Sequence, residues 1–125
     1  MGNSIIPFII FFLLVGIAIY QLLLALGFPL GAAAWGGKHR ILPIHLRIAS
    51  MFSALFLVCM GILILQHTPI IEPFLPTHPI LWVFTVFLGV NTVGNVVSQS
   101  KLERLIMTPI SSILFLLCLL VALGY

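Results

Sequence analysis

The sequence predicts an all-α integral membrane protein, a four-helix bundle in which each helix crosses the bilayer. Three observations predict this class: 62% of the residues are hydrophobic, only 6% are charged, and the mean hydropathy is +1.34. A soluble domain normally carries about 25% charged residues, so lipid must surround most of this chain. With 125 residues, the chain is predicted to form a single transmembrane domain over residues 1–125.

Four apolar segments are long enough to cross about 30 Å of hydrocarbon, which takes roughly 20 helical residues. The predicted spans are residues 5–26, 48–65, 80–100 and 106–123. Prolines mark the breaks between them, as expected of helix-breaking residues. The run Ala32-Ala33-Ala34 resembles a signal-peptide cleavage site. However, the first span has no basic leader and exceeds the usual apolar run of about 7–15 residues, so it is predicted to stay in the membrane.

All the basic residues fall in or beside two of the three connections between spans: Lys38, Arg40, Arg47, Lys101 and Arg104. The connection between the second and third spans contains Glu72 but no Lys or Arg. Because basic loops stay on the cytoplasmic side, we expect two short basic cytoplasmic loops and both termini outside. Trp35 and Trp82 are expected near the membrane interfaces. Five bases are too few for a nucleic-acid-binding face, so no nucleic-acid partner is expected.

Small and polar residues form stripes on two of the predicted helices, and polar groups inside a bilayer are costly unless they are bonded. Within about 100° of arc, the third span carries Asn91, Gly94, Asn95 and Ser98. Within about 60° of arc, the second span carries Arg47, Ser50, Ala54 and Gly61. Small residues allow close approach and Asn or Ser can bond across the gap, so these two helices are predicted to pack through their stripes.

Most polar side chains lie in the half of the membrane next to the basic loops. A water-filled pore needs polar lining along its whole length, so this distribution favours a polar pocket or network open toward the cytoplasm over a channel. The candidates for ligand binding or for the polar network are Arg47, Ser50, Asn91, Asn95, Ser98, Gln21 and Glu103. Packing contacts and a binding site both remain open as interpretations. Arg47 is either a topology-setting base or a binding residue, and Glu103 is expected to pair with Arg47, Arg40 or Arg104.

No catalytic, nucleotide-binding or metal motif is present in the sequence. Cys59 and Cys118 lie in separate apolar runs, without CxxC or His/Cys spacing. His39 and His45 lack a third ligand. We therefore predict no catalytic residue, no metal and no cofactor.

Two blocks of the sequence carry a family resemblance. The first contains Pro29-Leu30-Gly31, Ala34 to Arg40 with Trp35-Gly36-Gly37 at its centre, Leu42-Pro43 and Leu46-Arg47. The second contains Asn91-Thr92, Gly94-Asn95, Ser98, Ser100, Glu103-Arg104 and Pro109. Together they resemble an uncharacterised family of small four-span membrane proteins of Gram-positive bacteria. The resemblance implies the bacterial cytoplasmic (plasma) membrane, and it implies no activity and no site residues.

The sequence therefore predicts a small multi-pass membrane protein that is not an enzyme. Its cytoplasm-facing polar cluster is expected to pack helices and to bind a lipid head group, a small anion or a partner helix. The alternative is a small-solute transporter or channel that works as a homo-oligomer, because four short helices enclose little volume. A membrane enzyme is the third interpretation, with Arg47, His45 or Glu103 as its ionisable groups. Small multidrug exporters and small fluoride channels are similar in size, but their characteristic residues are missing.

Overall fold

The computed structural model describes residues 5–74 and 76–124, and every regular element in these ranges is helical. Four long helices run in alternating directions: α1 (Ile5–Ala25), α2 (Ile44–Ile64), α3 (Thr77–Val96) and α4 (Lys101–Ala122). Each of them is long and apolar enough to cross a membrane. Within the described residues, the prediction of an all-α chain with four helices of membrane-spanning character is confirmed.

Three of the helices begin earlier than their apolar runs predicted. α2 starts at Ile44, directly after Pro43. α4 starts at Lys101, because the Ser100 hydroxyl accepts a hydrogen bond from the Glu103 amide at 3.1 Å and caps the helix. α3 likewise begins before its predicted start, and it also ends before its predicted end. Hydropathy detects only the part of a helix that lies in hydrocarbon, whereas prolines and capping residues decide where the helix begins.

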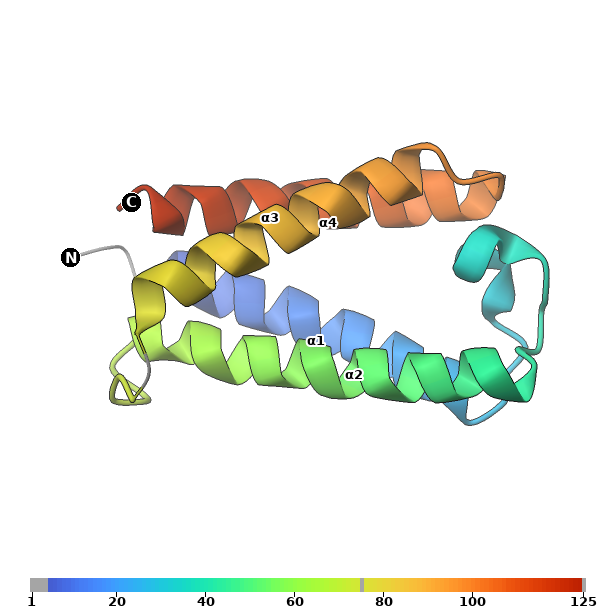
Figure 1. Ribbon diagram of the computed structural model, residues 1–125, viewed down its shortest axis with the longest axis horizontal. Helices are drawn as coiled ribbons and strands as arrows, with labels where there is room; N and C mark the ends of the chain where they lie inside the picture. The colour runs from blue at the N-terminus through green and yellow to red at the C-terminus, as the bar shows by residue number, and fades with distance from the viewer. Residues whose placement is uncertain (1–4, 75, 125) are drawn as a thin grey trace.

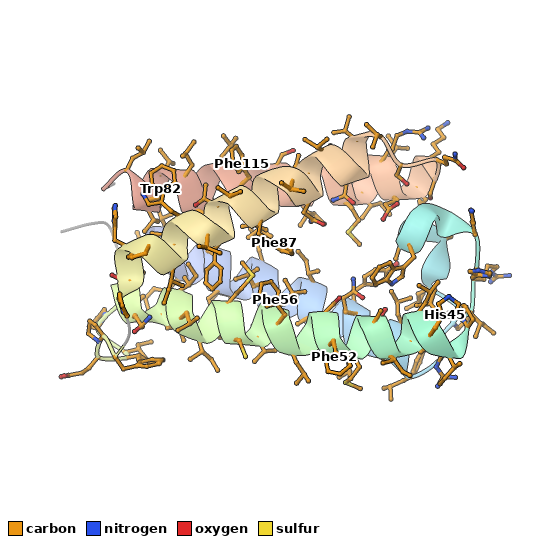
Figure 2. The ribbon with its side chains drawn as sticks, viewed as in Figure 1. His45, Phe52, Phe56, Trp82, Phe87 and Phe115 are labelled. Atoms are coloured by element: carbon orange, nitrogen blue, oxygen red, sulfur yellow. The ribbon has the colours of Figure 1, made fainter. Side chains whose placement is uncertain are left out.

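The four helices form two hairpins, α1–α2 and α3–α4, which diverge toward one end of the bundle (Figure 1). Contact between α2 and α3 is sparse by comparison with contact inside each hairpin. Where they do meet, the Phe56 ring of α2 contacts the Phe84 and Phe87 rings of α3 edge to face, at centroid distances of 6.3 and 5.1 Å. Figure 2 shows Phe56 and Phe87 between the two helices. The prediction that these helices pack through their small and polar stripes is therefore wrong.

Each stripe instead contacts the helix beside it in its own hairpin. Gly61 of α2 lies against α1, since a Cβ at Gly61 would stand 3.2 Å from the Phe11 ring. Asn95 of α3 donates a hydrogen bond from Nδ2 to the Ser111 hydroxyl of α4 at 3.0 Å. Small residues permit close approach to whichever helix is adjacent, and in this bundle α1 is adjacent to α2 and α4 is adjacent to α3.

The apolar core lies in the half of the bundle nearest the chain termini and draws on all four helices. Its fully buried members include Leu14, Met60, Leu88 and Leu114. Thr85 is a buried polar residue in this half, and it donates its hydroxyl to the Leu81 carbonyl at 2.8 Å within its own helix. The core holds the two hairpins together at this end, and the hairpins lie farther apart at the opposite end.

The opposite end, which we call the basic end, carries the loop of residues 26–43, the turn of residues 97–100 and the five Lys and Arg residues. Two short 3₁₀ turns in the loop, η1 (Gly31–Ala33) and η2 (Trp35–Gly37), reach across the gap and pack on α4 (Figure 1). The Ser100 hydroxyl donates a hydrogen bond to the Ala32 carbonyl at 2.6 Å. The loop therefore joins the two hairpins at the end where their helices separate.

Candidate functional site: a cavity between the hairpins

Where the hairpins diverge, they enclose a cavity of about 650 Å³. Polar side chains make up half of its lining: Gln21, Lys38, Ser53, Asn91, Asn95, Ser98, Gln99, Glu103 and Ser111. A smaller cavity of about 110 Å³ shares five of the lining residues and adds Phe56, Leu57, Leu88 and Leu114. The four residues that the smaller cavity adds are all apolar, and the charged residues line the main cavity only, so the lining becomes less polar toward the core.

Most of the residues singled out from the sequence meet in this cavity. Five of the seven line it: Gln21 from α1, Asn91 and Asn95 from α3, Ser98 from the turn, and Glu103 from α4. The two that do not line it, Arg47 and Ser50, lie on α2. The structure therefore gathers the predicted polar residues around an open space, whereas the predicted contact between α2 and α3 is not formed.

Arg47 reaches the end of α1 instead of the cavity. Its Nε donates a hydrogen bond to the Ala25 carbonyl at 2.9 Å, and its guanidinium lies 3.4 Å from the position of a Cβ at Gly27. The last carbonyl groups of a helix lack partners within the helix and carry partial negative charge, so a cation stabilises this terminus. Arg47 thus lies outside the polar network in which the sequence placed it.

Glu103 is half-buried in the cavity wall, and none of the arginines in the described ranges pairs with it. Its carboxylate accepts a hydrogen bond from the Ser98 hydroxyl, while the Arg104 guanidinium donates to the Ser98 carbonyl at 2.5 Å. Among the described residues, no Lys or Arg nitrogen pairs with this carboxylate, so the expected ion pair is not formed. The exposed Lys38 lies in the same lining, which gives the basic end of the cavity one charged group of each sign.

Trp35 supplies the aromatic part of the lining that comes from the loop. Its φ of 51° lies in the left-handed region, which costs about 1–3 kcal/mol for a residue other than glycine. The indole Nε1 donates a hydrogen bond to the hydroxyl of the fully buried Ser50 at 2.9 Å. This bond links the loop to α2 and holds Trp35 beside the cavity. Ser50 therefore positions the cavity wall without lining it.

Four polar lining residues, Lys38, Ser53, Gln99 and Ser111, and the loop residue Trp35 are not among the seven candidates drawn from the sequence. In the sequence, Trp35 indicates only a membrane-interface residue and Lys38 only a topology-setting base. The signal for Ser53 was available, because a hydroxyl in the middle of an apolar run needs an explanation. The loop is rich in Gly and Ala, with Gly36-Gly37, and this composition predicts a tight interfacial turn over the helix ends. The local sequence does not indicate the contacts that the loop makes with α4 and Ser100.

No group of three His, Cys, Asp or Glu side chains in the described ranges is close enough to hold a metal ion. Comparisons with protein families, with curated proteins and with solved structures find no match to this chain. The fold and the cavity define its class: a small multi-pass membrane protein of two helical hairpins with a polar cavity between them.

Proposed function

We propose that this protein binds an amphipathic molecule of the membrane in the cavity between its hairpins, and that it does so without catalysing a reaction. The gradient in the lining is the observation that supports this most. An amphiphile has a polar head and an apolar tail, and the cavity offers polar groups at the basic end and apolar side chains toward the core. A volume of about 650 Å³ also falls within the range of about 300–1,000 Å³ for small-molecule sites.

Access from the bilayer would be lateral, between α2 and α3. These helices have little contact apart from the rings around Phe56. Asn91 and Gly94 are exposed although both line the cavity, which indicates an opening on the face of α3 that carries them. A lipid could reach the cavity through this opening without displacing the loop at the basic end.

The basic end faces the cytoplasm in this proposal, and both termini face outward. The five Lys and Arg residues at that end support this orientation by the positive-inside rule. The resemblance of the two sequence blocks to a Gram-positive family supports a bacterial plasma membrane.

Lysine labelling tests the orientation, because Lys38 and Lys101 are the only lysines of the chain and both lie at the basic end. A membrane-impermeant amine reagent is expected to leave both lysines unmodified in intact cells and to modify them in inside-out vesicles. Peptide mapping locates the label. Modification of either lysine in intact cells would reverse the orientation.

Filling the cavity tests the binding site. A Cβ at Gly94 has no atom within 4 Å, so Gly94→Phe is expected to place its ring in the cavity without disturbing the fold. Gly16→Phe is the matched control, because Gly16 is equally open but lies on α1 outside the lining. Bound ligand stabilises the folded state by about 2.7 kcal/mol at one hundred times its Kd. Short-chain lipids with dioctanoyl tails are therefore expected to raise the Tm of the wild type and Gly16→Phe, but not that of Gly94→Phe. An equal rise in both variants would place binding elsewhere.

Transport by a homo-oligomer remains the second candidate from the sequence, but the cavity favours binding. It ends against Leu88 and Leu114 of the apolar core, so among the described residues of one chain the polar lining does not continue to the terminal end. Reconstituted protein is expected to show no flux of small ions or polar solutes across liposomes. Measurable flux that Gly94→Phe abolishes would replace the binding proposal with a transporter.

A further inference from the structure

Three lining residues carry hydrogen-bonding side-chain groups that bond to nothing else in the described part of the chain. Gln21 of α1, Ser53 of α2 and Asn91 of α3 line both the main cavity and its smaller extension. None of these side chains bonds to another described residue, and the Oε1 atom of Gln21 is buried without a partner. We call these three residues the unpaired trio. Three helices thus bring two amides and a hydroxyl to one space.

Helix packing does not account for the unpaired trio. Polar residues that pack helices in membranes bond to each other, as Asn95 does with Ser111 at 3.0 Å one turn along α3 from Asn91. An amide without a partner in hydrocarbon costs several kcal/mol. Two such amides facing one cavity point to a ligand that completes their bonds.

We propose that the unpaired trio binds an uncharged hydrogen-bonding group, such as a hydroxyl or an ester carbonyl, of a neutral amphiphile. This inference rests on the proposed function and restricts its ligand to amphiphiles without a net charge. Amide and hydroxyl side chains both donate and accept, so they can bond to a hydroxyl, which does both, and to an ester carbonyl, which only accepts. The trio lies about one to three helical turns inside the ends of its helices at the basic end.

The positions of the charged side chains in the cavity support an uncharged ligand group at the unpaired trio. Lys38 and Glu103 line the main cavity only, and the smaller extension has no ionisable residue in its lining. A charged group near the centre of a bilayer costs about 2.5–3.5 kcal/mol even on the most lenient scale. Phe56, Leu57 and Phe87 stand beside the trio and offer an apolar surface to the ligand's chains.

Two lipids with the same chains test the charge of the ligand. Dioctanoylglycerol ends in a hydroxyl, whereas dioctanoyl phosphatidic acid carries a phosphate in its place. Dioctanoylglycerol is expected to raise the Tm of the purified protein in a saturable way, at concentrations at least tenfold lower than dioctanoyl phosphatidic acid requires. Equal or tighter binding of the phosphatidic acid would overturn the inference and leave the proposed function intact. A shift with neither lipid would overturn both.

Stability without ligand separates a binding subsite from a packing contact. Gln21→Leu and Asn91→Leu remove unpaired amides, so each is expected to leave the ligand-free Tm unchanged or raised while weakening dioctanoylglycerol binding at least tenfold. Asn95→Leu removes a bonded amide and is expected to lower the ligand-free Tm. Ser53→Ala removes the hydroxyl of the trio and is expected to weaken dioctanoylglycerol binding. Ser112 is a half-buried serine outside the lining, so Ser112→Ala is expected to leave that binding unchanged. Loss of ligand-free stability in Gln21→Leu and Asn91→Leu, to the same extent as in Asn95→Leu, would show that the trio packs helices.

Discussion

Replacing Gly37 with alanine is expected to release the loop of residues 26–43 from the α3–α4 hairpin and to destabilise the protein by about 3 kcal/mol. Gly37 has a φ of 73°, where an L-residue costs about 1–2 kcal/mol. In addition, a Cβ there would stand 2.6 Å from the Ser100 Cβ and 2.8 Å from the Ala32 oxygen. The new methyl group would therefore break the Ser100–Ala32 hydrogen bond on which loop docking depends.

Gly36→Ala is the matched control for this substitution. Gly36 has a similar φ of 78°, but a Cβ there has no atom within 4 Å. Its cost should therefore be the backbone strain alone, about 1–2 kcal/mol. Denaturant unfolding in detergent micelles measures both variants. Equal losses of stability would show that the loop does not dock on Ser100.

The second large effect is expected at the contact between α1 and α2. Gly61→Leu should cost about 2 kcal/mol, because its Cβ alone would stand 3.2 Å from the Phe11 ring and the longer side chain must displace it. Phe11→Ala makes room for the leucine, so the double variant should recover most of the loss. The coupling energy from the double-mutant cycle is the measured quantity.

Gly16→Leu provides the control, because a Cβ at Gly16 has no atom within 4 Å. It is expected to leave stability unchanged and to show no coupling with Phe11→Ala. Additive effects of Gly61→Leu and Phe11→Ala would show that the small-residue stripe of α2 does not face α1. Such a result would instead support the packing of α2 against α3 that the sequence predicts.

The helices were the most predictable feature of this protein. Hydrocarbon thickness sets the length of an apolar run, and proline marks its ends. The four spans therefore follow from the positions of apolar residues and prolines along the sequence. Their first turns were missed at Ile44, Thr77 and Lys101, because those turns are capped or follow proline and do not depend on hydropathy.

Helix pairing was not predictable in the same way. The residues that let two helices approach closely are also the residues that line a polar cavity, so the stripe containing Asn91 and Asn95 fits either role. In the structure the two amides take different roles. Asn95 bonds to α4, while Asn91 lines the opening and bonds to no side chain or backbone group within residues 5–74 and 76–124. Whether an amide packs helices or lines the cavity depends on where the neighbouring hairpin lies. The position of that hairpin is set by the packing of the whole bundle and not by the local sequence.

The loop at the basic end was the least predictable part. Trp35, Gly36 and Gly37 all have positive φ, and only the glycines indicate this in the sequence. The long-range contacts of Ser100 with Ala32 and of Trp35 with Ser50 then fix the loop over the cavity. The first contact joins the loop to the turn before α4, and the second joins it to α2.

Fluorescence quenching of Trp35 tests most directly whether an amphiphile occupies the cavity. Trp35 is one of two tryptophans and lines the cavity, while Trp82 lies at the terminal end (Figure 2). In Trp82→Phe protein, a dioctanoylglycerol brominated on its acyl chains is expected to quench Trp35 to a saturating level. Adding Gly94→Phe is expected to abolish this saturable quenching. Quenching that rises without saturation and is the same with and without Gly94→Phe would mean that Trp35 meets the lipid from the bilayer and that the cavity holds no ligand.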